Sequence, residues 1–348
     1  MNILPVNSLN FLNYQVSQKE QNRTSLGLKM ANPLQADTIS FGHAQQTVKK
    51  MGNRADAISF SLAKRIRNEL IGPHEQLKEV FINRFRQYLS DGNTKNLLTF
   101  FDRVKTAASI CEKSATRHWN NYKSNIEKMT DVSGFCFLLE KKQSFSTFMS
   151  EFISMLEDGD IQVKEVEYHR LAPIYKSNKI IRTFDSLDQT IMQKMKKSII
   201  DIQQPRTQFW TDVDSMSGYS AMHILVLDKE GHTHEVKIMT RGMSELQTIE
   251  NLMYKIRNGK GIDKKYKYFE GIFEPLKVPD NERMLTDEQK KLQAAMTKYT
   301  QDAYIDILEK PFSENIEFLR PNNPLLKDFD FNNIRELVIA CDKIAENS

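Results

Sequence analysis

The sequence has few cysteines, glycines and prolines, and it contains no long apolar run. Three cysteines that are odd in number and far apart, Cys111, Cys136 and Cys341, exclude a disulfide framework and a clustered zinc site. Thirteen glycines and ten prolines in 348 residues fall below the average usage of about 12 %, so we expect a fold rich in helix. No stretch approaches the roughly eighteen apolar residues of a membrane span, and the first residues lack a secretory pattern. These absences predict a cytoplasmic chain with no membrane partner.

The composition is that of a globular protein. Hydrophobic residues make up 40 % of the chain and charged residues 27 %, which excludes a wholly disordered or fibrous protein. A net charge of +4 is too small for a protein that wraps nucleic acid, but it is compatible with a local pocket for phosphates.

Hydrophobic periodicity predicts helices that alternate with short strands after a flexible leader over residues 1–50. Gly72-Pro73 is expected to end the first helix, and Thr286 with Gln289 forms a capping box. The clearest feature is a hairpin whose arms are residues 223–227 and 234–239. Helices are expected near 56–70, 77–88, 107–128, 145–156, 187–199, 243–257, 286–307 and 334–344, and strands near 97–101, 134–140 and 161–166.

A group of cations and hydroxyls lies where a strand leads into a helix. Arg103 and Lys105 precede Thr106, a candidate helix N-cap, so they would lie beside the free N–H groups and the positive dipole end of that helix. Ser109 and Lys113 are four residues apart and share one helix face. The pattern suits a phosphate, although a solvated surface has the same composition.

Two acidic residues stand in or beside predicted strands. Asp131 lies at the edge of the strand that begins Val132-Ser133-Gly134, and strand alternation places Glu235 on the face opposite its apolar neighbours. If the two strands are neighbours, both carboxylates can hold Mg²⁺ between nucleotide phosphates, and one of them can deprotonate an attacking hydroxyl. A half-exposed sheet with ordinary polar positions is the alternative.

A loop hinged at Gly218 delivers Tyr219 and then His223 into the first arm of the hairpin. An exposed tyrosine on such a loop is a stacking platform for a base; the alternative is a tyrosine packed on the sheet. His232 and His234 next to Glu235 suggest zinc only superficially, because no further ligand recurs at metal spacing.

In this order, the four pieces resemble the synthetase domain of the RelA/SpoT family of guanosine polyphosphate synthetases, especially its small single-domain members. The motifs are R-V-K-T at 103–106 with Ser109 and Lys113, D-V-S-G at 131–134, G-Y-S at 218–220 with His223, and E-V-K-I-M-T at 235–240. The resemblance covers about residues 56–260 and leaves a helical C-terminal extension over 261–348.

The resemblance implies an α+β fold, a mixed β-sheet flanked by helices and similar to nucleotidyltransferases. It implies ATP-dependent transfer of pyrophosphate to a ribose 3′-hydroxyl, with Mg²⁺ as cofactor and GDP or GTP as acceptor, giving guanosine tetra- or pentaphosphate. The implied ATP site consists of Arg103, Lys105, Ser109 and Lys113. Asp131 and Glu235 are the implied metal-binding and catalytic residues, and Tyr219 and His223 the implied acceptor site.

Several positions depart from the family pattern. Cys136 replaces an arginine, while Lys237 and Met239 replace a glutamine and an arginine. The segment 210–216 is expected to be a loop with two acids, which would repel a 5′-diphosphate, and the extra segment near 170–207 is a candidate acceptor-specific cap. Two alternatives follow: a toxic synthetase that pyrophosphorylates the 3′ end of tRNA, and a catalytically degenerate nucleotide-binding module. An antitoxin or a second copy of the chain is the protein partner considered.

Overall fold

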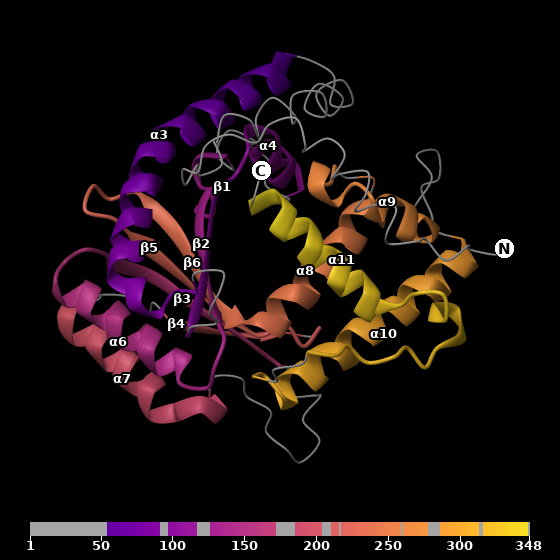
Figure 1. Cartoon of the computed structure of the whole chain (residues 1–348). Helices are drawn as coiled ribbons and strands as arrows, with labels where there is room; N and C mark the ends of the chain where they lie inside the picture. Colours follow the sequence, from indigo (N-terminus) through magenta and orange to yellow (C-terminus); the bar gives the residue numbers. More distant parts are fainter. Residues whose placement is uncertain are drawn as a thin grey trace, which may run out of the picture.

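The computed structural model describes residues 54–90, 97–116, 126–171, 185–203, 210–215, 217–257, 259, 261–277, 286–312 and 316–346. The expected leader over residues 1–50 lies outside this part of the chain. A mixed sheet with helices on both faces confirms the predicted α+β class (Figure 1).

The sheet has six strands in the order β1-β2-β6-β5-β3-β4. The pairs β2 with β6 and β3 with β4 are parallel, and the other neighbours are antiparallel. The predicted hairpin is confirmed as β5 and β6. The strands are β1 (Leu98–Val104), β2 (Ser133–Leu139), β3 (Gln162–Leu171), β4 (Trp210–Ser215), β5 (Ala221–Leu227) and β6 (Thr233–Thr240).

One face of the sheet is the main hydrophobic core. It is covered by α3 (Arg54–Phe85), α6 (Ser144–Glu157) and α7 (Asp185–Gln203). Phenylalanine rings dominate the packing: Phe85 of α3 lies 4.8 Å from Phe137 of β2 and 5.2 Å from Phe148 of α6, measured between ring centroids. Burial of these rings fixes which side chains of each strand point away from the core.

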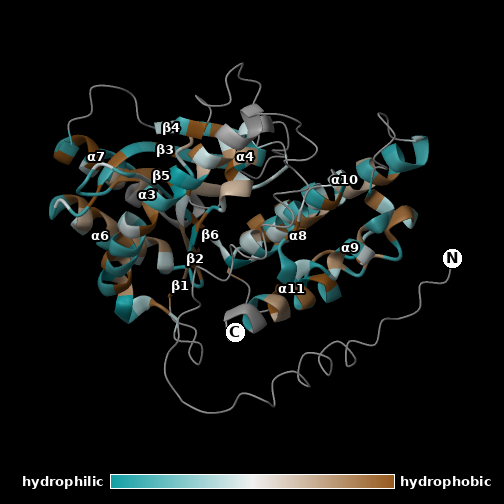
Figure 2. Ribbon diagram, turned by 90° about the horizontal axis from the view of Figure 1, so that it is seen from above, coloured by the Kyte–Doolittle hydropathy of each residue, from teal (hydrophilic) through white to brown (hydrophobic). Residues whose placement is uncertain are grey.

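The opposite face is covered by the C-terminal helices at one end only. There Leu138, Ala221 and Met239 pack into a second core, and the two groups of helices stand on either side of the sheet (Figure 2). The rest of this face carries polar side chains from β1, β6, β5 and β3, and we call it the polar face. The helices are α8 (Arg241–Arg257), α9 (Phe269–Ile272), α10 (Asp287–Glu309), which begins at the predicted capping box, and α11 (Phe331–Glu346).

Gly72-Pro73 does not end the first helix, contrary to the prediction. Helix α3 continues through Pro73 to Phe85, although proline lacks the N–H that a helix interior uses. Its two halves are held by separate contacts: Leu62 packs in a small cluster with α4 (Ala107–Thr116), and Phe81 packs in the main core. Tertiary packing therefore outweighs the local stop signal.

Two further expectations concern the acidic segment 210–216 and the extra segment near 170–207. Residues 210–215 form strand β4 rather than a loop, and Arg170 of β3 forms ion pairs with Asp212 (3.2 Å) and Asp214 (3.0 Å). Helix α7 packs in the main core through Met192, Met195 and Ile199, on the face away from the polar residues. The described part of the expected cap is thus scaffold, and both acids of the expected loop are neutralised.

Among the described residues, no helix combines the length and the hydrophobicity that crossing a membrane requires.

Candidate functional site

Three neighbouring strands bring the predicted phosphate and acidic residues to one edge of the polar face. Arg103 of β1 pairs with Gly134 of β2, and Gly134 pairs with Glu235 of β6. Asp131 lies three residues before Gly134, and the N–H of Lys105 donates to the carbonyl of Val132 at 2.8 Å. Residues more than a hundred positions apart therefore meet at one rim.

Helix α4 begins at this rim. The hydroxyl of Thr106 accepts a hydrogen bond from the N–H of Ser109 at 3.2 Å, which confirms the predicted N-cap. Ser109 is exposed in the first turn, and its hydroxyl lies 3.1 Å from that of Thr106. Arg103 is also exposed and forms no ion pair within the described part of the chain. The start of α4 thus offers a helix dipole, a hydroxyl and a cation to an anion.

Asp131 is held by two lysines. Its Oδ2 lies 2.6 Å from Nζ of Lys105 and also forms an ion pair with Lys113. Burial lowers the pKa of Lys105 to about 8, helped by the charge of Arg103 and opposed by that of Asp131. Lys105 is therefore mostly charged at neutral pH, and three cations converge at the rim.

The second carboxylate oxygen of Asp131 has no such partner. Oδ1 is buried and accepts no hydrogen bond from any residue that the structure describes. Burial alone would raise the pKa of Asp131, but Lys105 and Lys113 hold it well below its usual range, so the group is ionised. A buried anionic oxygen without a partner is costly, and a hard cation such as Mg²⁺ prefers this kind of ligand.

Glu235 is the other acidic group of the rim. Its side chain is 13 % exposed, with Oε1 3.5 Å from Nδ1 of His223 and Oε2 3.6 Å from Nζ of Lys237. Burial would raise its pKa, but His223 and Lys237 lower it to about 2, while the negative charge of Asp131 acts in the opposite direction. The carboxylate is ionised and lies within electrostatic range of Asp131.

Tyr219 and His223 extend the site along the polar face. The hydroxyl of Tyr219 lies 2.9 Å from Nε2 of His223, which links it to Glu235. Tyr219 is half-buried rather than exposed as expected, and burial raises the pKa of its phenol far above the usual range. The ring is therefore held in a defined position.

The loop before Tyr219 depends on Gly218. Its φ is +92°, and a Cβ at this position would lie 2.8 Å from Cβ of Tyr304 in α10. We expect Gly218→Ala to lower the free energy of unfolding by about 3 kcal/mol, from backbone strain plus overpacking. Urea unfolding measures this. Gly271→Ala is the control, because a Cβ there meets nothing within 4 Å; equal effects of the two substitutions would contradict the assignment.

A buried polar chain runs beneath the rim, on the core side of the sheet. His74 of α3 contacts Asp102 at 2.9 Å and Ser133 at 2.8 Å. Ser133 contacts His234 at 2.6 Å, and His234 contacts Asp228 at 3.2 Å. Asp102, Ser133 and His234 are direct chain neighbours of Arg103, Gly134 and Glu235. This buried polar chain therefore connects β1, β2 and β6 beneath the candidate site.

The proton count of this buried chain is constrained. The Ser133 hydroxyl has one proton for two histidine contacts, so it donates to one ring nitrogen and accepts from the other. His234 is fully buried as a member of the buried polar chain, and Nδ1 of His232 lies 3.1 Å from Oδ2 of Asp228. Within the part of the chain that the structure describes, neither His232 nor His234 belongs to a group of three possible metal ligands.

Sequence reasoning missed Glu167 and His169. Both lie on β3, which extends beyond the predicted end of that strand, and they alternate with buried Val166 and Tyr168. Burial and the neighbouring His223 lower the pKa of His169. The alternation of polar and apolar residues over 165–169 was the signal that could have placed both on the polar face.

Solved structures similar to this chain were found by comparison of folds. Small alarmone synthetase 1 from Bacillus subtilis is 17 % identical, with 72 % of this chain and 93 % of that chain covered and a TM-score of 0.39. The same enzyme bound to its product pppGpp gives 16 % identity, 71 % and 95 % coverage and a TM-score of 0.37. A GTP pyrophosphokinase family protein from Streptococcus pneumoniae is 16 % identical, with 68 % of this chain and 96 % of that chain covered and a TM-score of 0.35.

No protein-family model matches the chain, and no curated protein matches it in sequence. The identities and TM-scores of these solved structures are low, so the chemical role of each site residue rests on the side chains of this chain.

Proposed function

We propose that the protein transfers the β,γ-pyrophosphate of ATP to the 3′-hydroxyl of GDP or GTP. In this reaction the 3′-oxygen forms a bond to the β-phosphorus, the bond from that phosphorus to the α,β-bridging oxygen breaks, and AMP leaves. The observation that carries the proposal is the convergence of three cations and two ionised carboxylates on one rim, next to a helix start.

The cationic side of the rim suits the triphosphate of ATP. Arg103 would contact the base and phosphates, and Lys105, Ser109 and Lys113 would hold the phosphate chain at the start of α4. Both lysines pair with Asp131 in this structure. A triphosphate would take over these lysines and leave the Asp131 carboxylate to a metal ion.

Asp131 and Glu235 fit Mg²⁺. Oδ1 of Asp131 is buried without a hydrogen-bond partner, and both carboxylates are ionised. The ion would neutralise charge on the phosphate oxygens. Glu235 would serve as a metal ligand or as the base that removes the proton of the acceptor hydroxyl.

Tyr219 is the proposed platform for the acceptor guanine. The contact of its hydroxyl with Nε2 of His223, at 2.9 Å, orients the ring. We expect Tyr219→Ala to raise KM for the acceptor about 10- to 100-fold, because stacking on one base contributes about 1–3 kcal/mol. KM for ATP should change little. Initial rates at varied acceptor and varied ATP measure both.

Tyr219→Phe is the matched control, since it keeps the ring and removes only the hydroxyl bond to His223. Its acceptor KM should stay close to that of the wild type. An equal rise of KM for acceptor and ATP in Tyr219→Ala would refute the stacking role.

Two other functions use the same site. With tRNA as acceptor, a basic run would hold the RNA backbone: Lys255, Arg257, Lys260, Lys264, Lys265 and Lys267. In the structure, however, Lys265 pairs with Asp342 and Lys267 with Glu270. A degenerate nucleotide-binding module has no use for two ionised carboxylates that are mostly buried. The rim therefore favours an active transferase.

An acceptor panel tests the proposal. Purified protein with ATP and Mg²⁺ is offered GDP, GTP or deacylated tRNA, and the products are separated by anion exchange and on denaturing gels. Guanosine tetra- or pentaphosphate is the expected product. Transfer only to tRNA would select the second function, and nucleotide binding without any transfer would select the third.

A further inference from the structure

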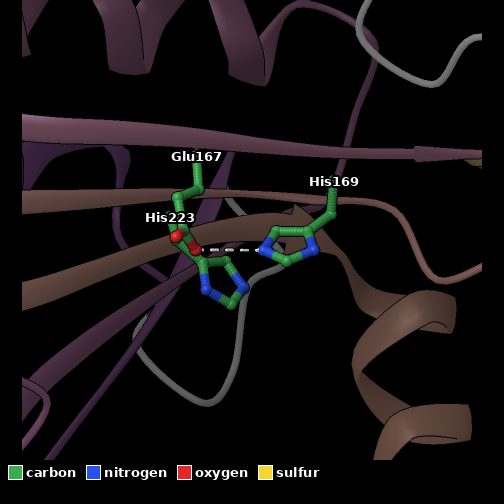
Figure 3. A group of neighbouring side chains, drawn as sticks. All are labelled: Glu167, His169 and His223. Atoms are coloured by element: carbon green, nitrogen blue, oxygen red, sulfur yellow. Dashed lines mark hydrogen bonds and ion pairs between the residues drawn. The ribbon is translucent and has the colours of Figure 1, made fainter. Parts of the chain in front are cut away.

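Glu167, His169 and His223 form a compact cluster on the polar face (Figure 3). Glu167 of β3 stands directly opposite His223 of β5 in the antiparallel register, and His169 is two residues further along the same face of β3. All three are partly accessible, and each has a nitrogen or oxygen atom within 4.8 Å of the others.

We infer that these three side chains bind one divalent transition-metal ion of the Zn²⁺ class, at a site separate from Asp131 and the cationic rim. Two imidazole nitrogens with one carboxylate are a donor set for Zn²⁺ or related ions, whereas Mg²⁺ prefers oxygen ligands alone. The inference does not depend on the proposed activity.

The spacing of the donor atoms suits such an ion. Nε2 of His169 lies 3.4 Å from Oε2 of Glu167, which is long for a hydrogen bond. Two ligands of a tetrahedral Zn²⁺ with bonds of about 2.0 to 2.1 Å lie about 3.3 Å apart. The third donor, at most 4.8 Å away, reaches this spacing by a side-chain movement of about 1.5 Å or less.

His223 has the outer contacts of a metal-bound histidine. One ring nitrogen lies 2.9 Å from the Tyr219 hydroxyl, and the other lies 3.5 Å from the Glu235 carboxylate. Whichever nitrogen binds the ion, the other keeps a partner that orients the ring, as is usual for histidine ligands. The ring of His169 packs 4.5 Å from that of His223, which holds the two imidazoles side by side.

The surrounding charges also permit a cation. Lys237 is the basic residue that pairs with His223 in the register of β5 and β6, and its Nζ lies 3.6 Å from Glu235. Its charge is therefore offset by Glu235. The charge of Arg170 is likewise offset, by Asp212 and Asp214. A bound ion would fix His223 and, through it, Tyr219 and Glu235.

Calorimetric titration tests the inference. Untagged full-length protein is stripped with a chelator, returned to millimolar Mg²⁺, and titrated with ZnCl₂. We expect the wild type to bind one equivalent of Zn²⁺. The dissociation constant for Zn²⁺ should rise at least tenfold in Glu167→Gln and in His169→Asn. The Glu167 side chain is 43 % exposed, so its substitution should leave the fold intact, which urea unfolding checks.

Two controls separate this site from others. His232→Ala removes a histidine outside the cluster, and Asp131→Asn removes a carboxylate of the rim. Both variants should still bind one equivalent of Zn²⁺ with wild-type affinity. Visible absorption of bound Co²⁺, lost in Glu167→Gln, gives a second readout. Equal Zn²⁺ binding by the wild type and Glu167→Gln, or loss of the equivalent in Asp131→Asn alone, would overturn the inference. Neither outcome depends on whether pyrophosphate is transferred.

Discussion

Glu235→Gln should lower the rate of pyrophosphate transfer at least about 10³-fold, within the range for losing a general base or a metal-ligand charge. The wild-type carboxylate has a pKa of about 2 and is ionised throughout the neutral range. Glutamine keeps the shape but can neither accept a proton nor supply a negative charge to a metal ion. Steady-state transfer from labelled ATP to GDP measures the effect.

The fold should survive this substitution. Glutamine keeps the size of the side chain and an oxygen that accepts hydrogen bonds, and the side chains of His223 and Lys237 are 15 % and 21 % exposed, so water can solvate them. We therefore expect the free energy of unfolding to change by about 1 kcal/mol or less. Glu230→Gln, an exposed position in the turn of the same hairpin, is the matched control and should retain full activity. Undiminished turnover in Glu235→Gln would remove Glu235 from the catalytic machinery.

Ser133→Ala should lower the free energy of unfolding by about 3 kcal/mol. The substitution removes hydrogen bonds of 2.8 Å to His74 and 2.6 Å to His234, and it leaves a nitrogen of each buried ring without its partner. Each unsatisfied buried group costs about 1–3 kcal/mol. Urea unfolding measures the loss. Ser146→Ala is the control, because Ser146 is exposed and makes one bond to a neighbouring carbonyl. A loss no larger than that of the control would contradict the account of the buried chain.

The same buried chain predicts a stability that falls with acid. Burial lowers the pKa of His234 below its usual range, so the unfolded chain takes up a proton there at a higher pH than the folded chain does. Its contribution is therefore complete above about pH 6.5 and is lost as the pH falls. Asp228 and Asp102 also have lowered pKa values, because hydrogen bonds and neighbouring cations outweigh burial. Their contributions disappear at still lower pH. Urea midpoints between pH 4 and 8 test the sign.

Local sequence signals predicted those elements whose start or end is determined by residues close to it in sequence. The hairpin of β5 and β6, the capping box at Thr286 and the N-cap at Thr106 depend on residues that are near in sequence, and all three are confirmed. The stop at Gly72-Pro73 was wrong because α3 packs in two hydrophobic clusters along its length. Strand β4 was missed because its polar residues pair with Arg170 of the neighbouring strand, a contact that depends on the tertiary fold.

In the candidate site, too, some features could be predicted from the sequence and others depend on the folded structure. The motifs predicted which residues gather at the rim, and the register of β1, β2 and β6 brings Arg103 and Glu235 to either side of Gly134. The pairing of Lys105 and Lys113 with Asp131 could not be predicted, because it depends on side-chain positions in the folded protein. The cluster of Glu167 and His169 with His223 likewise requires the antiparallel register of β3 and β5.

Transfer from ATP labelled on the β-phosphate tests the central claim most directly. With GDP or GTP as acceptor and Mg²⁺ present, the label should appear in the guanosine product while AMP is released in equal amount. Release of ADP, or no labelled product with any acceptor while Mg²⁺-ATP still binds, would contradict the transfer of pyrophosphate at this site.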